Sequence, residues 1–240
     1  MNKKVTGHLA ALVTILIWGT TFISTKVLLV DFEPIEILFF RFILGFLALL
    51  IVYPHRMRGT TKRQEVVFAA AGLCGVCLII FNGAKMQLNP IGDLLAVAAA
   101  VVWACYSVLT RKISGFGYHT IQTTRRVFAY GIVFMIPALF LFDCRIGAER
   151  FANPVYLGNL IFLGLGASAL CFVTWSMAVK ILGAVKTSIY IYLVPVITVV
   201  TSALILKERV TVMSGIGTVL ALIGLFLSEY RGKTQKQEEI

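Results

Sequence analysis

Residues 9–26 read LAALVTILIWGTTFISTK, and a related stretch at residues 94–111 reads LLAVAAAVVWACYSVLTR. Each stretch is apolar, with a tryptophan near its middle (Trp18 or Trp103) and a cation at its end. Repeated membrane helices of this kind are typical of transporters that are built from two related halves. The repeat therefore predicts a duplicated membrane protein.

The composition agrees with a chain whose main solvent is lipid. Hydrophobic residues make up 59% of the sequence and charged residues 14%, with a mean hydropathy of +0.90. Soluble domains hold roughly 45–50% apolar and about 25% charged residues. The net charge of +11 would favour a nucleic-acid partner in a soluble protein. Here the cations lie between apolar runs, so we expect them to orient the chain in a lipid bilayer and expect no nucleic acid.

Apolar runs separated by short polar loops predict an all-α, multi-pass transmembrane helix bundle of about eight helices. The third run reaches only about 24 Å at the α-helical rise, which is short of a roughly 30 Å hydrocarbon core. The expected spans are His8–Val30, Pro34–Tyr53, Val66–Phe81, Ile91–Thr110, Ile121–Phe142, Tyr156–Lys180, Val185–Leu206 and Val212–Tyr230.

The loop cations predict the orientation. With the N-terminus in the cytoplasm, most of the loop cations lie on the cytoplasmic side, as the positive-inside rule requires. We therefore expect a plasma (inner) membrane protein with cytoplasmic N- and C-termini. The first run is long enough to span, so it is expected to be a retained helix and not a cleaved signal peptide. Three spans separate the two repeat starts, so the repeat is inverted, which is the geometry of alternating access.

Polar and aromatic side chains at helical spacing predict a central cavity. In the first span Thr14, Trp18 and Thr21 share one helical face, and the repeat copy and the seventh span show similar faces. The alternative is that the threonines bond their own backbone and pack between helices. The expected cavity residues are Thr14, Trp18, Thr21, Trp103, Tyr106, Trp175, Tyr190, Pro195 and Thr198.

Charged residues inside or at the ends of spans are candidates for gating or charge pairing, because a charge in the bilayer centre is costly. Lys26, Arg41 and Glu208 could gather near the outer mouth, although Lys26 could also snorkel to the interface. On the cytoplasmic side the candidates are Arg111 and Arg126, the repeat counterparts of Lys26 and Arg41.

Catalytic and metal-binding patterns are missing from the sequence. It has no P-loop, no H-E-x-x-H, no nucleophile elbow and no dinucleotide fingerprint, and its three histidines lack ligand spacing. Cys74 and Cys77 form a C-x-x-C, but we expect no redox role at lipid depth. We therefore predict no enzyme activity, no metal and no cofactor.

Four stretches together resemble the EamA-type transporters of the drug/metabolite transporter superfamily. They are LIWGTTFISTK at 16–26, residues 89–112, LGLGASALCFVTWSMAVKILGA at 163–184, and YLVPVITVVTSALILKERVT at 192–211. The resemblance implies two inverted five-helix repeats around a central cavity, and a small metabolite as substrate. The residues that match family positions are Trp18–Gly19, Lys26, Arg41–Phe42, Trp103 to Tyr106, Pro195 and Glu208.

The chain departs from that family pattern in its first half. The expected division is a shortened first repeat of three helices at 1–83, a complete second repeat of five helices at 84–231 and a polar cytoplasmic tail at 232–240. The missing stretch would include a cavity-lining helix and a carboxylate, so Arg111 and Arg126 would lack an acidic partner.

Three functions follow from these patterns. The leading hypothesis is a secondary transporter that exports small metabolites, such as amino acids or related compounds, by alternating access. The second is an internally deleted paralogue that inserts into the membrane but does not transport. The third is a self-associating protein, in which a second copy in a homodimer supplies the missing wall.

Overall fold

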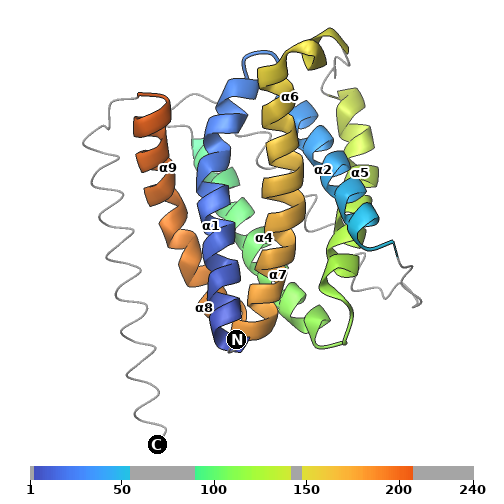
Figure 1. Cartoon of the computed structure of the whole chain (residues 1–240), viewed down its shortest axis with the longest axis vertical. Helices are drawn as coiled ribbons and strands as arrows, with labels where there is room; N and C mark the ends of the chain where they lie inside the picture. Colours follow the sequence, from blue (N-terminus) through green and yellow to red (C-terminus); the bar gives the residue numbers. More distant parts are fainter. Residues whose placement is uncertain (1–2, 55–89, 142–147, 208–240) are drawn as a thin grey trace, which may run out of the picture.

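The structure is a computed structural model that describes residues 3–54, 90–141 and 148–207. The first half of this part of the chain forms four long helices, of which the first and fourth run in one direction and the second and third in the other (Figure 1). They are α1 (Lys3–Leu28), α2 (Pro34–Val52), α4 (Pro90–Ser114) and α5 (Thr120–Leu141). The expected third and eighth spans, and Glu208, lie outside the described residues.

The second half begins with a short 3-10 turn, Ala148–Ala152, followed by α6 (Pro154–Ile161). Asn153 starts α6 as an N-cap, because its side-chain oxygen accepts the N–H of Val155 at 3.0 Å. The helix continues as a π-helical segment, Phe162–Leu170, and then as α7 (Cys171–Leu182). The sequence predicted one regular span here and did not reveal the π-helical segment.

The seventh expected span is also irregular. It consists of α8 (Ala184–Ser188), a 3-10 turn at Ile189–Tyr192, and α9 (Leu193–Ile205). Pro195 explains the change of helix type, because it cannot donate to the carbonyl four residues earlier, in the 3-10 turn. Pro195 therefore lies in the first turn of α9, where proline is tolerated.

Four helical stretches among the described residues are long and apolar enough to cross a membrane. They are Lys3–Leu28, Pro34–Val52, Pro154–Leu182 and Ala184–Ile205. These four correspond to the first, second, sixth and seventh expected spans, while α4 and α5 coincide with the fourth and fifth.

Helix α1 is the packing centre of this bundle, with α7 on one side and α9 on the other (Figure 1). Its contact with α7 is made of small residues, since Ala10 and Ala11 pack against Ala178. Its contact with α9 includes Gly19, which faces Ile197 and whose carbonyl accepts the Thr198 hydroxyl at 3.0 Å. Small residues allow helix backbones to approach closely in lipid.

One end of the bundle is closed by a buried ion pair. Arg150, just before α6, donates to both Glu36 oxygens, at 2.8 and 3.2 Å, and to the carbonyl of Asp31 at 2.7 Å. Glu36 is fully buried, and it also accepts the N–H of Glu33 at the start of α2. The Arg150 guanidinium lies 4.5 Å from the centre of the Phe32 ring. We call Arg150, Glu36, Asp31 and Phe32 the charged corner.

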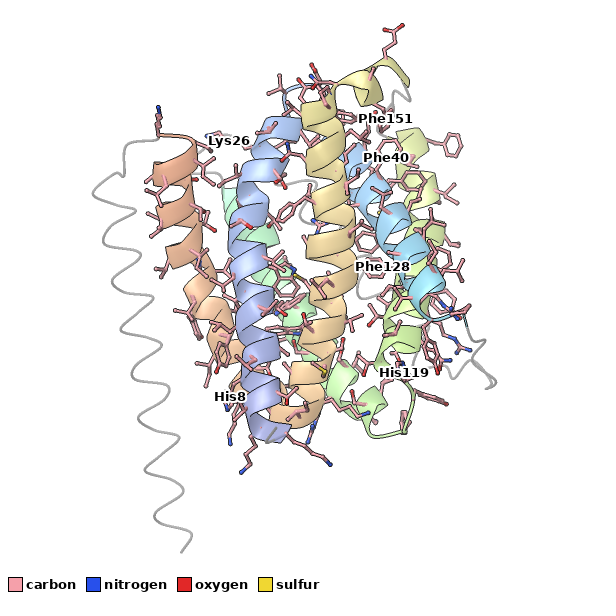
Figure 2. All side chains as sticks on the ribbon, in the orientation of Figure 1. His8, Lys26, Phe40, His119, Phe128 and Phe151 are labelled. Carbon is pink, nitrogen blue, oxygen red and sulfur yellow. The ribbon has the colours of Figure 1, made fainter. Side chains whose placement is uncertain are left out.

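Aromatic rings pack beneath the charged corner. Phe40 and Phe151 lie close together (Figure 2), with ring centres 5.0 Å apart, and both Phe151 and Tyr156 contact Phe32. The corner and these rings join the α1–α2 loop to the beginning of α6.

At the opposite end, cations cap the C-terminal ends of helices. Arg111 donates to the carbonyl of Val179 at 3.1 Å and to that of Lys180, at the end of α7. Arg125 donates to the carbonyl of Tyr53, the C-cap of α2, at 2.5 Å. The partial negative charge of a helix C-terminus favours such partners.

Close packing at Gly19 predicts a strong effect of an added methyl group. In Gly19→Ala the new methyl would overlap Ile197, and we expect about 1–3 kcal/mol of destabilisation. Gly158→Ala is the matched control, because a methyl group on Gly158 meets no atom within 4 Å. Thermal unfolding in detergent should show a lower Tm for the first variant alone, and equal Tm values would contradict the packing described.

The charged corner predicts a larger loss. Glu36→Gln leaves Arg150 without its counter-charge, and removal of one partner of a buried pair costs about 3–5 kcal/mol. Glu149→Gln, which changes an exposed carboxylate beside Arg150, is the control. The same melting measurement should separate the two variants, and a wild-type Tm for Glu36→Gln would show that the pair contributes little.

Candidate functional site

Three tryptophans from three helices meet in the middle of the bundle. The ring centres of Trp18 on α1 and Trp103 on α4 are 5.4 Å apart, and Trp175 on α7 lies 5.4 Å from Trp18 and 5.7 Å from Trp103. These are all the tryptophans in the chain. We call them the tryptophan cluster. Tyr106 stacks on Trp103 at 5.2 Å, and Phe172 packs edge-on against Trp18.

The three indole N–H groups are not equivalent. That of Trp18 donates to the backbone carbonyl of Ala167 at 3.0 Å. Those of Trp103 and Trp175 are buried and have no hydrogen-bond partner within the described part of the chain. An indole nitrogen can only donate, and an unpaired buried donor costs about 1–3 kcal/mol. Two unpaired donors in one cluster are therefore a candidate site for an acceptor.

The π-helical segment positions two polar contacts beside the cluster. The carbonyl of Ala167 accepts the indole N–H of Trp18. The hydroxyl of Ser168, the next residue, accepts the Nε–H of Arg41 at 2.9 Å. π-Helical turns are rare and are frequent at functional sites. Arg41 lies about 10 Å along α2 from its first residue and makes no ion pair with a described side chain. This placement puts a positive charge inside a spanning helix.

A polar cleft lies between α4, α5 and α7, towards the N-terminal end of α1 and the start of α5. The volume open to the centre of a water molecule is about 20 Å³, enough for water but not for a metabolite. Tyr106 belongs both to this wall and to the group around Trp103, so the cleft ends beside the tryptophan cluster. We call it the hydroxyl cleft; its lining residues are Tyr106, Thr110, Ser114, Tyr118, Thr120, Thr123, Thr124, Val127 and Ser176.

Four of the predicted cavity residues are linked by ring contacts: Trp18, Trp103, Tyr106 and Trp175. Tyr190 packs against the same hydrophobic cluster. The predicted threonines serve helix contacts. Thr14 bonds the carbonyl of Ala10 at 2.8 Å and the Thr174 hydroxyl at 2.6 Å.

Thr21 donates to the carbonyl of Trp18 at 2.6 Å, and Thr198 bonds α1 as described above. Tyr190 lies nearer the N-terminus of α1, where its hydroxyl is 2.6 Å from His8 Nδ1. Pro195 is exposed.

The predicted charged residues are spread over the bundle. Lys26 is exposed at the end of α1 opposite His8 (Figure 2), and Arg41 binds Ser168. Because Glu208 lies outside the described residues, the group of Lys26, Arg41 and Glu208 stays a prediction. Arg111 caps α7, and Arg126 is half-buried in α5.

Sequence reasoning missed Ser168, the pairing of Glu36 with Arg150, and the hydroxyl cleft. The cleft had a signal in the sequence, because hydroxyl residues are frequent between positions 110 and 124 on both sides of the α4–α5 turn. The ion pair had none, since its partners lie 114 positions apart.

Comparison with known proteins gives the family. A model of the EamA-like transporter family matches residues 5–85 and 90–230. An uncharacterised transporter of Archaeoglobus fulgidus is 25% identical over 294 aligned positions, which cover 95% of this chain and 98% of that protein. The uncharacterised transporter YyaM of Bacillus subtilis is 27% identical over 70% of this chain, but the chain spans only 56% of its length.

One more relative carries a functional name. A probable amino-acid metabolite efflux pump of Escherichia coli is 22% identical over 84% of this chain and 67% of that protein. The family match covers nearly the whole sequence. The chain therefore belongs to the EamA-like transporter family, whose members are multi-pass membrane transporters of small metabolites and not enzymes.

Proposed function

We propose that this protein is a secondary transporter that exports small metabolites, amino acids or related compounds, by alternating access, with the tryptophan cluster at its substrate site. The observation that carries the proposal is the contact between Trp18 and Trp103, because these residues occupy equivalent positions in the two sequence repeats.

This contact has a geometric meaning. Helices α1 and α4 run in opposite directions (Figure 1), as the helices of an inverted repeat do. Residues related by a two-fold axis touch each other only if they lie close to that axis. A site on the axis is presented in the same way to both sides of the membrane, which suits alternating access.

The two ends of the bundle support a transport cycle because they differ. The charged corner and the rings beneath it close the end where α2 begins. At the other end the hydroxyl cleft reaches Tyr106, beside Trp103. With the N-terminus in the cytoplasm, as the loop cations favour, the cleft faces inward and the closed end faces outward.

The names of two relatives support export from the cell. One is the probable efflux pump of Escherichia coli, and the other is a probable terminal-alkyne amino-acid exporter of Streptantibioticus cattleyicolor, 24% identical over 72% of this chain and 57% of that protein. The direction of the proposed transport rests on this similarity together with the predicted placement in the plasma membrane.

A shortened first repeat is part of the proposal. The alignment with the Archaeoglobus protein runs over 294 positions, more than the 240 residues of this chain, so that relative has residues without a counterpart here. This observation supports a first repeat at 1–83 that lacks helices, followed by a complete one at 84–231. It also favours the second candidate, a membrane protein that does not transport or that completes its wall with a second copy.

The substrate site is tested by Trp103→Ala. Loss of this ring removes the contact between the two repeats, so we expect at least a tenfold loss of amino-acid efflux from cells that express the chain, with normal insertion. Phe140→Ala is the control, because Phe140 is 83% exposed on α5 and far in sequence from the cluster. Efflux at the wild-type rate from Trp103→Ala cells would remove the cluster from the substrate site.

Transport by the purified chain separates the two candidate functions. We expect proteoliposomes loaded with a mixture of labelled amino acids to release at least one of them faster than protein-free vesicles. Cross-linking in the same vesicles reports on the homodimer. Absence of release, beside release by a variant with the missing helices restored, would favour the non-transporting paralogue.

A further inference from the structure

The unpaired donors define what the tryptophan cluster can bind. We infer that the indole N–H groups of Trp103 and Trp175 bind the carboxylate of an organic anion, and that Arg41 supplies the compensating positive charge. This inference rests on the proposed function, since it names the chemical class of the substrate at the same site.

The first step is the pair of donors. Trp103 and Trp175 come from different helices, their ring centres are 5.7 Å apart, and both Nε1 atoms are buried without a partner among the described residues. Trp175 is completely buried. A buried donor that finds no acceptor has lost its water and gained nothing, so two of them on neighbouring rings favour a ligand that brings two acceptor atoms.

The second step is the charge. Arg41 has five N–H donors and no acceptor, and its Nε–H goes to the neutral Ser168 hydroxyl. Ser168 lies about two helical turns before Trp175 on the same continuous helix. In a medium of low dielectric constant a charge at this range still interacts strongly, so an anion beside the indoles is stabilised by Arg41.

The third step concerns acceptors on the protein. The acidic side chains whose burial the structure gives, Asp31, Glu33, Glu36 and Glu149, lie in or next to the charged corner. Glu36 is already paired with Arg150. Within the described part of the chain no carboxylate is recorded against Arg41 or the tryptophan cluster, so a carboxylate on the ligand would complement both.

Other ligand classes fit less well. A cation would be repelled by the positive charge of Arg41. The indole faces that could attract a cation are covered by one another, by Tyr106 and by Phe172. A neutral apolar ligand would leave both N–H groups unpaired. A carboxylate has two oxygens for two donors and a charge for Arg41.

The hydroxyl cleft, which has room only for water in this structure, would offer a polar approach to this site once it widens. Tyr106 lines the cleft and stacks on Trp103, and Ser176, also in the wall, directly follows Trp175. Hydroxyl groups can donate to a carboxylate on its way, whereas an apolar wall would strip its water without replacement.

The test uses the full chain in detergent, and its readout is intrinsic tryptophan fluorescence. All three tryptophans belong to the cluster, so the emission reports on this site alone. The probes are propionate, 4-methylpentanoate and 3-phenylpropionate, each paired with its own amide, which has the same shape and no charge. We expect a saturable emission change in which at least one acid binds about tenfold more tightly than its amide.

Variants assign the donors. Trp103→Phe and Trp175→Phe keep a ring but remove the N–H. Each should weaken binding of the acid about tenfold and binding of the amide less, because the neutral amide oxygen is the weaker acceptor. Trp18→Phe is the control, because the N–H that it removes already donates to the carbonyl of Ala167. The ratio of acid affinity to amide affinity should therefore not change. Arg41→Lys should keep most of the preference for the acid, and Arg41→Gln should lose it.

Two results would overturn the inference. One is equal binding, or no binding, of acids and amides by the wild-type chain, a comparison that needs no variant. The other is wild-type acid affinity in both Trp103→Phe and Trp175→Phe. Transport of neutral or cationic metabolites without preference for acids would refute the anion site and leave the proposed function intact. Selective acid binding without transport would support the anion site and refute the proposed function.

Discussion

The arrangement of the central helices depends on the contacts of the Trp18 side chain. Its ring touches Trp103 on α4 and Trp175 on α7, and its N–H bonds the π-helical segment at Ala167. It reaches them because α1 packs closely on α7 through small residues and on α9 through Gly19. One side chain therefore links α1 to α4, to α7 and to the π-helical segment, and also forms a wall of the candidate site.

Apolar runs were enough to predict the long helical stretches among the described residues, because in lipid each span must satisfy its own backbone hydrogen bonds. They could not predict the π-helical segment, since Phe162–Leu170 has the same apolar composition as the helices on either side. Nor could they give the direction of a hydroxyl group. Thr14 and Thr21 lie on the predicted face, but their hydroxyls bond the backbone of α1 itself. The choice between cavity and backbone is made by rotamer and neighbours, which a single sequence does not record.

The candidate site was predictable where it depends on repeat positions and not where it depends on charge pairing. Trp18 and Trp103 were found because the repeat marks them as equivalent, and the structure places them in contact. Arg111 was expected to lack an acidic partner, and it donates to the carbonyls of Val179 and Lys180 near the end of α7, which the sequence did not predict. A helix C-terminus can serve as the partner of a cation, and nothing in the spacing of acidic residues reveals it.

The charged corner has a consequence for kinetics. Partial separation of Arg150 from Glu36 would leave two charges that are neither paired nor hydrated, which is less stable than either a closed corner or one flooded with water. In the proposed transport cycle, intermediate openings of this end would therefore be sparsely populated, so that it would be either closed or fully hydrated. Because Glu36 is buried, we expect the rate of such an opening to depend on how readily water reaches this carboxylate.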